Sequence, residues 1–217
     1  MGKFLSYDNF LNQALRKLAD CFCLSLLWVL CCIPVVTVGA ASTALYYTVH
    51  KAVRFNRGGI WQEYWRSFRQ NFKQATLVWI ILLLVYCLLI AGCYSAYLLY
   101  LAGSIPRAVL IFLLVLAALV TMWASYLFPH IARFQCRTKQ LLKNCELMAL
   151  LNFFRSILLL VLLAIAVLAL LYIPLALLFV PAVYMWAGSY ILERVFRKYM
   201  LVEDLEAEDM LNANADI

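Results

Sequence analysis

The sequence predicts an all-α, polytopic membrane protein, and two observations support that prediction. Of its 217 residues, 67% are hydrophobic and only 13% are charged, whereas soluble domains are nearer half apolar and a quarter charged. Four stretches also lack Lys, Arg, Asp and Glu, namely residues 21–50, 74–106, 108–132 and 156–192. Each exceeds the roughly 18 apolar residues that indicate a spanning helix, and none has the strict alternation of a β-barrel strand. Lipid is therefore expected to solvate much of the chain.

The second and third apolar stretches predict a helical hairpin. Six basic residues lie within 51–73 and five within 133–155, and basic residues close to span ends favour the cytoplasm. Residues 74–101 are therefore expected to leave the cytoplasm, and residues 108–128 to return after the short turn AGSIPR.

The first and last stretches each have basic residues on both sides. A single span would place one of these two basic clusters outside, although basic residues close to span ends favour the cytoplasm. The last stretch has 37 residues and would be about 55 Å long as one helix, against a hydrocarbon core of about 30 Å. It contains Pro174 and Pro181, and proline breaks or kinks helices. Two short spans at 157–173 and 177–192 fit better. In the first stretch, a broken hairpin is expected around Pro34 to Gly39.

These expectations combine into one multi-pass domain over residues 1–202. It would contain three helical hairpins, that is six short helices, with both termini in the cytoplasm. Four or five spans are alternatives, and a five-span chain would place one terminus outside. Residues 203–217 are acidic and are expected to form a flexible cytoplasmic tail.

The basic segment after the first stretch predicts an amphipathic helix at the inner membrane surface. At 100° per residue, its aromatic residues form one stripe and its bases lie beside it, the residues being Trp61, Trp65, Phe68, Phe72, Arg66, Arg69 and Lys73. A second amphipathic segment begins at Arg133. Two interpretations remain open: a connector that binds anionic lipid headgroups, and a docking helix for a cytoplasmic partner.

A polar stripe follows the expected helix break. Gly39, Thr43, Tyr46 and His50 share one helical face, and together with Pro34 and Thr37 they are a candidate helix break or groove. A groove here could contact an uncharged, hydroxyl-rich solute such as a sugar. The alternative is helix packing, because small residues allow close approach and hydroxyl groups bond across helices.

The sequence predicts neither catalysis nor a metal or cofactor site. H-E-x-x-H, G-x-S-x-G and Walker A motifs are absent, and both His50 and His130 fall at expected span ends. The paired cysteines are one or two residues apart, so on a helix they do not share a face and cannot form a compact chelate. No nucleic-acid motif accompanies the basic residues, which indicate contact with anionic headgroups instead.

Two segments carry a family resemblance. LLWVLCCIPVVTVGAASTALYY, from Leu26, and SFRQNFKQATLVWIILLL, from Ser67, resemble the YesL-like family of small bacterial membrane proteins (DUF624, a domain of unknown function). The recognisable parts are P-V-V-T-V-G-A at 34–40 and F-x-x-x-F-x-x-A at 68–75. The resemblance implies a multi-pass protein of the bacterial cytoplasmic membrane. Because genes of that family often lie beside carbohydrate-uptake transporters, it also implies an accessory or regulatory component of sugar uptake, with a sugar transporter as partner. A small uniporter or channel for an uncharged solute is the alternative.

Overall fold

The computed structural model describes residues 2–55, 58–104, 106–134, 136–200 and 210, with side chains from Leu15 onward. Its regular elements are all helical, which confirms the predicted fold class. They are α1 (Gly2–Cys32), η1 (Val35–Thr37), α2 (Val38–Thr48), η2 (Val49–Arg54), α3 (Ile60–Leu101), α4 (Arg107–Arg133), α5 (Thr138–Leu151), α6 (Phe153–Tyr172), η3 (Pro174–Leu178) and α7 (Val180–Phe196). Apart from Met210, the expected acidic tail lies outside the described residues.

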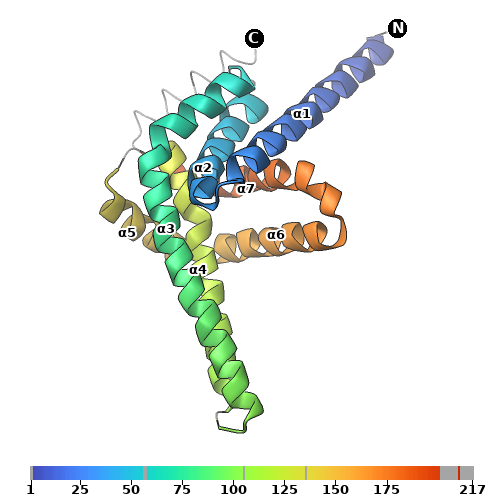
Figure 1. The fold of residues 1–217 in the computed structure, drawn as a ribbon. Coiled ribbons are helices and arrows are strands. Elements are labelled where there is room, and N and C mark those ends of the chain that lie inside the picture. The colour runs from blue at the N-terminus through green and yellow to red at the C-terminus, as the bar shows by residue number, and fades with distance from the viewer. Residues whose placement is uncertain (1, 56–57, 105, 135, 201–209, 211–217) are drawn as a thin grey trace.

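The predicted central hairpin is present as α3 and α4. The two helices run side by side in opposite directions, and their far half projects beyond the rest of the molecule (Figure 1). Gly103 has a φ of 71°, which an L side chain rarely adopts, and it makes the tight turn between the helices possible. Within the described chain, α3, α4 and α6 are long and apolar enough to cross a membrane. The structure is thus that of a multi-pass helical membrane protein.

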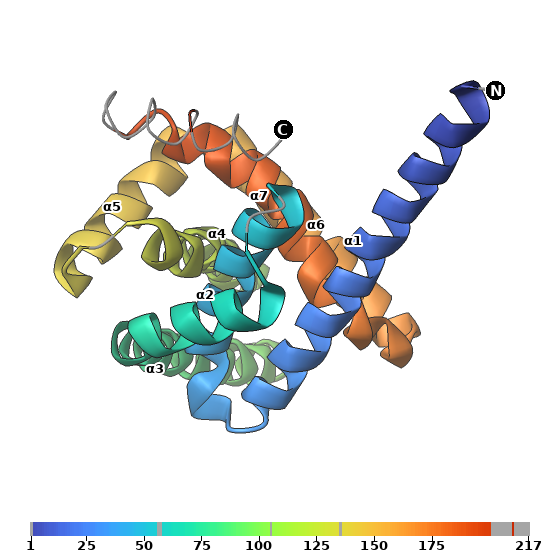
Figure 2. The same ribbon diagram turned by 90° about the horizontal axis from the view of Figure 1, so that it is seen from above.

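The last apolar stretch is broken where its prolines predict. Helix α6 ends at Tyr172, η3 begins at Pro174, and α7 begins at Val180, a little later than expected. Pro181 lies in the first turn of α7, where its missing N–H group costs no helical hydrogen bond. The pair α6–α7 runs across the α3–α4 hairpin rather than alongside it, as both views show (Figures 1 and 2). The three expected helix pairs therefore do not form one parallel bundle.

The first apolar stretch is also broken at the expected place. Helix α1 ends at Cys32, and α2 begins at Val38 after the η1 turn. The Thr37 hydroxyl donates to the carbonyl oxygens of Cys31 and, at 2.7 Å, of Pro34. The Trp79 indole donates to the Val35 carbonyl at 2.7 Å and so attaches the break to α3.

Helix α2 is the centre of the fold rather than a lipid-facing span. Residues 39–46 are all buried, and α1, α3, α4 and α7 surround the helix. On one side it packs against Leu24 and Tyr64, and on the other against a cluster that includes Tyr126 and Phe196. The small residues Gly, Ala and Ser on α2 allow this close approach on every side.

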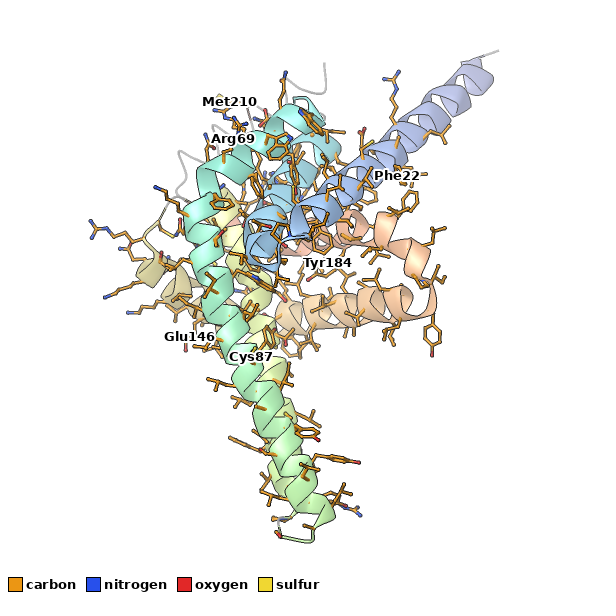
Figure 3. The ribbon with its side chains drawn as sticks, in the orientation of Figure 1. Phe22, Arg69, Cys87, Glu146, Tyr184 and Met210 are labelled. Carbon is orange, nitrogen blue, oxygen red and sulfur yellow. The ribbon has the colours of Figure 1, made fainter. Side chains whose placement is uncertain are left out.

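The two expected amphipathic segments differ in form. The first is not a separate surface helix, because it continues into the apolar part of α3 through a bend (Figure 1). The second forms the separate helix α5, whose Leu141 and Cys145 are buried against α4. Its remaining face carries the exposed Lys139, Lys143 and Glu146, the last of which is labelled in Figure 3.

Gly39 provides a test of the packing around α2. A Cβ atom at this position would lie 2.5 Å from the Ala75 carbonyl oxygen and 2.6 Å from Cβ of Trp79, so Gly39→Val forces α2 away from α3. We expect a loss of about 1–3 kcal/mol in the free energy of unfolding, read as a lower melting temperature in detergent. Gly92→Ala is the control, because its added Cβ would meet nothing within 4 Å. Equal melting temperatures for the two variants would contradict this packing.

Candidate functional site

A buried carboxylate joins four elements in the interior. Glu193 of α7 is only 4% exposed. Its Oε1 accepts a hydrogen bond of 3.0 Å from the Tyr46 hydroxyl of α2 and lies 3.1 Å from Nε2 of His50 in η2. Its Oε2 lies 3.0 Å from Nη2 of Arg133, the last residue of α4. We call these four residues the Glu193 centre.

Local geometry explains how α2 and its continuation η2 supply two of these residues. Tyr46 and His50 are one turn apart, so they share a helical face, and their rings stack with centroids 6.2 Å apart. His50 lies in η2, a π-helical continuation of α2, and such segments occur frequently at functional sites. The neighbouring Arg54 extends the contact to α7, because its Nη1 donates to the Ser189 carbonyl at 3.2 Å and its guanidinium lies 4.3 Å from the Tyr190 ring.

The partners of Glu193 keep its carboxyl group ionised. Burial by itself would raise the pKa of Glu193, but the close contact with His50, followed by the charge of Arg133 and the Tyr46 hydroxyl, lowers the pKa below its ordinary value. Both carboxylate oxygens are therefore engaged by donors in the folded state. This arrangement supports an ion-pair network that fixes α2, α4 and α7 relative to one another.

A cavity of about 930 Å³ lies beside the centre. It is bounded by the amphipathic start of α3, the end of α4 and the first turn of α5, which lie around the same side of the molecule in Figure 2. Among the described residues that line it, none is acidic. Its main polar lining consists of Arg66, Arg133, Arg137, Gln70, Asn71 and Gln74. We call it the basic cavity; Arg133 belongs both to this cavity and to the Glu193 centre.

A smaller cavity of about 230 Å³ lies between α3, α4, α6 and α7. Tyr184, labelled in Figure 3, contributes a hydroxyl group to its lining. Tyr86 and Thr121 also line it and bond to each other at 3.1 Å. Most of the remaining lining is apolar, from residues such as Leu82, Leu159 and Leu163.

The polar stripe expected after the helix break is divided between two roles. Gly39 is the contact point of α2 with α3, and the Thr43 hydroxyl donates back to the Gly39 carbonyl at 3.0 Å. Tyr46 and His50 instead bind Glu193.

Pro34 and Thr37 form the turn itself. None of the six candidate residues lines the two cavities described above. These contacts favour packing over a groove at this stripe.

The aromatic–basic set of α3 is also divided. Trp61 and Phe72 are exposed, whereas Trp65 and Phe68 are half-buried, and neighbouring rings contact one another at centroid distances of 5.9, 5.5 and 5.5 Å. Arg69, labelled in Figure 3, and Lys73 are exposed outside the basic cavity, and Arg66 lines it. Trp61, Trp65, Phe68, Phe72, Arg69 and Lys73 are referred to below as the aromatic–basic face.

Sequence reasoning missed the residue at the centre of the site. Glu193 directly follows the last uncharged stretch, and a charged residue at the end of such a stretch is ordinarily solvated, so its position does not signal burial. Its partners could not be named from the sequence either, because Tyr46 is 147 positions away and Arg133 is 60.

The family comparison agrees with the resemblance seen in the sequence. Residues 21–93 match the model of a family described as a protein of unknown function, DUF624. The chain therefore contains a DUF624 domain, which takes in the end of α1, all of α2 and most of α3. That segment includes Tyr46, His50 and the aromatic–basic face. No curated protein and no solved structure matches the chain significantly.

Replacing Glu193 tests whether the centre stabilises the fold. Glu193→Ala removes the carboxylate that His50, Tyr46 and Arg133 share while Arg133 stays largely buried. We expect the free energy of unfolding to fall by about 3–5 kcal/mol, measured by denaturant titration in detergent. Glu146→Ala, on the exposed face of α5, should change it by about 0.5 kcal/mol or less. A Glu193→Ala protein as stable as the wild type would refute this role.

Proposed function

We propose that this protein is a non-catalytic, accessory or regulatory subunit that binds a carbohydrate-uptake transporter at the cytoplasmic surface of the bacterial membrane. The observation that supports this proposal best is the exposed aromatic–basic face on a helix held firmly by the core. The link to sugar uptake rests on the family resemblance. Together these features favour a partner-binding role.

The aromatic–basic face has the properties of a prepared interface. Phe68 packs against the buried residues on both sides of α2, so the aromatic stripe is anchored in its middle. Trp61, at one end of the stripe, is 61% exposed. Tryptophan and arginine are enriched among residues that dominate binding energy. A rigid face loses little side-chain entropy when a partner binds.

The positive charge of this region indicates that the partner has an acidic surface. Arg69 and Lys73 on α3 and the exposed Lys139 and Lys143 on α5 are all positive. An acidic cytoplasmic surface on the transporter would complement them and would speed association. Anionic headgroups could use the same bases, so the experiment must separate a protein partner from lipid.

Affinity purification from native membranes tests the docking. We expect a tagged wild-type chain to retain a sugar transporter, identified by mass spectrometry. Trp61→Glu and Arg69→Glu should each reduce the retained transporter by about tenfold, since the first replaces an exposed aromatic contact with a charge and the second reverses a charge. Both residues are exposed, so membrane insertion should be unchanged.

Arg107→Glu is the matched control, because Arg107 is an exposed base at the opposite end of the α3–α4 hairpin. It should retain the transporter at the wild-type level. Loss of the transporter in all three variants, or in none, would contradict docking through this face. Retention of anionic lipid without any transporter would assign the face to the membrane surface.

A small uniporter for an uncharged solute is the second candidate, and the hydroxyl-bearing cavity between α3, α4, α6 and α7 favours it. If this candidate is correct, purified protein in sealed liposomes should equilibrate a radiolabelled neutral sugar. Tyr184→Leu, which replaces a hydroxyl-bearing ring of that cavity with an apolar side chain, should slow the flux at least about tenfold. Vesicles that remain sealed to sugar with the wild-type protein would exclude this function and leave the accessory role.

A further inference from the structure

We propose that the basic cavity binds a ligand that carries a phosphate group. The site is independent of the docking face and of the transporter, because it is lined by a different set of side chains. Among the lining residues, only Arg66 is a candidate site residue predicted from the sequence, where it was grouped with the surface bases Arg69 and Lys73.

Three arginines from three parts of the fold line this cavity. Arg66 belongs to α3, Arg133 is the last residue of α4, and Arg137 directly precedes α5. Guanidinium groups bind phosphate oxygens through paired hydrogen bonds, which gives geometry as well as charge. Because the three arginines come from separate elements, they can donate to different oxygens of one bound phosphate group.

The balance of charge favours an anion. Glu193 lies behind Arg133 and offsets part of its charge, but none of the described lining residues is acidic. Arg66 and Arg137 are exposed at the cavity and add their full positive charge. Occupation by an anion would therefore relieve the mutual repulsion of these bases.

The start of α5 adds a directed dipole. Arg137 is its N-cap residue and Gln140 lies in its first turn, and both line the cavity. Arg137 makes no side-chain cap to the helix, and the first turn of α5 contains no acidic residue. Backbone N–H groups at such a terminus attract anions.

The walls of the cavity are held in place by hydrogen bonds. Gln74 of α3 donates to the Cys136 carbonyl at 2.8 Å, which fastens the segment before α5 to α3. Asn71 is held by a 3.1 Å hydrogen bond to the Ser67 carbonyl. Arg133 is fixed by Glu193. A site whose side chains are already ordered loses less conformational entropy when a ligand binds.

The size of the cavity indicates more than a bare phosphate ion. Its volume of about 930 Å³ is near the upper end of the range for small-molecule sites. Tyr47 and Phe134 contribute aromatic surface to the lining. A phosphate ester fits these features, and the ester could be a free metabolite or a phospholipid headgroup.

Two experimental arms distinguish these sources. The chain is placed in nanodiscs of phosphatidylcholine, and thermophoresis follows titration with inorganic pyrophosphate, glucose 6-phosphate or glucose. In parallel, native mass spectrometry measures which lipid is retained from vesicles that mix phosphatidylglycerol with phosphatidylcholine. Binding of the phosphates but not of glucose would identify a free ester, and retention of phosphatidylglycerol alone would identify a headgroup.

Matched arginine variants connect binding to the cavity. Arg66→Gln and Arg137→Gln should each weaken binding of the phosphate probe or retention of phosphatidylglycerol by about tenfold, since each removes one charge-assisted hydrogen bond. Arg107→Gln is the control, because Arg107 is an exposed base that lies outside both the cavity lining and the aromatic–basic face. Both cavity residues are exposed, and size-exclusion profiles should show that all variants fold.

The proposal would be overturned by any of three results. These are equal binding by Arg66→Gln, Arg137→Gln and the wild type, equal weakening by Arg107→Gln, or no response to either phosphate probe together with no preference for phosphatidylglycerol. None of these results bears on docking, which is tested by transporter retention.

Discussion

The structure depends on the pairing of a single buried carboxylate. Glu193 is held by Tyr46, His50 and Arg133, and a carboxylate in the interior is tolerated only when such partners compensate for its lost hydration. Because the partners come from α2, η2 and α4, these contacts attach α7 to all three elements. This attachment and the packing of α6 on α4 together hold the α6–α7 pair across the α3–α4 hairpin (Figure 1).

The close packing of α2 makes that pairing possible. A helix bearing Gly39, Ala40 and Ala44 on its surface brings the neighbouring backbones near, and Tyr46 and His50 then reach α7 from the end of the same helix. In membrane proteins, where lipid competes equally well for apolar side chains, such close contacts and internal hydrogen bonds supply much of the specificity. The DUF624 match spans this helix and most of α3.

Arg133 connects the interior to the surface. One Nη atom binds Glu193, and the same side chain lines the basic cavity. A ligand in the cavity would therefore contact a group that also positions α7. The bases of α3 serve two different surfaces, because Arg66 lines the cavity while Arg69 and Lys73 remain outside it.

The sequence alone determined the membrane character, the α3–α4 hairpin and the places where the first and the last apolar stretches break. Hydropathy and proline act locally, so Pro34 and Pro174 could be interpreted without knowledge of their neighbours. The aromatic–basic stripe of α3 was visible for the same reason, since helical periodicity places its members on one face.

Tertiary structure alone decided which polar residues meet. Tyr46 and His50 were noticed as part of a stripe with Gly39 and Thr43, but the pattern could not show that a distant glutamate separates their roles. The packing of α3, α4 and α5 likewise decides that one cavity is lined by Arg66, Arg133 and Arg137. Contacts between residues far apart in the chain are set by the packing of whole helices, and local periodicity carries no information about them.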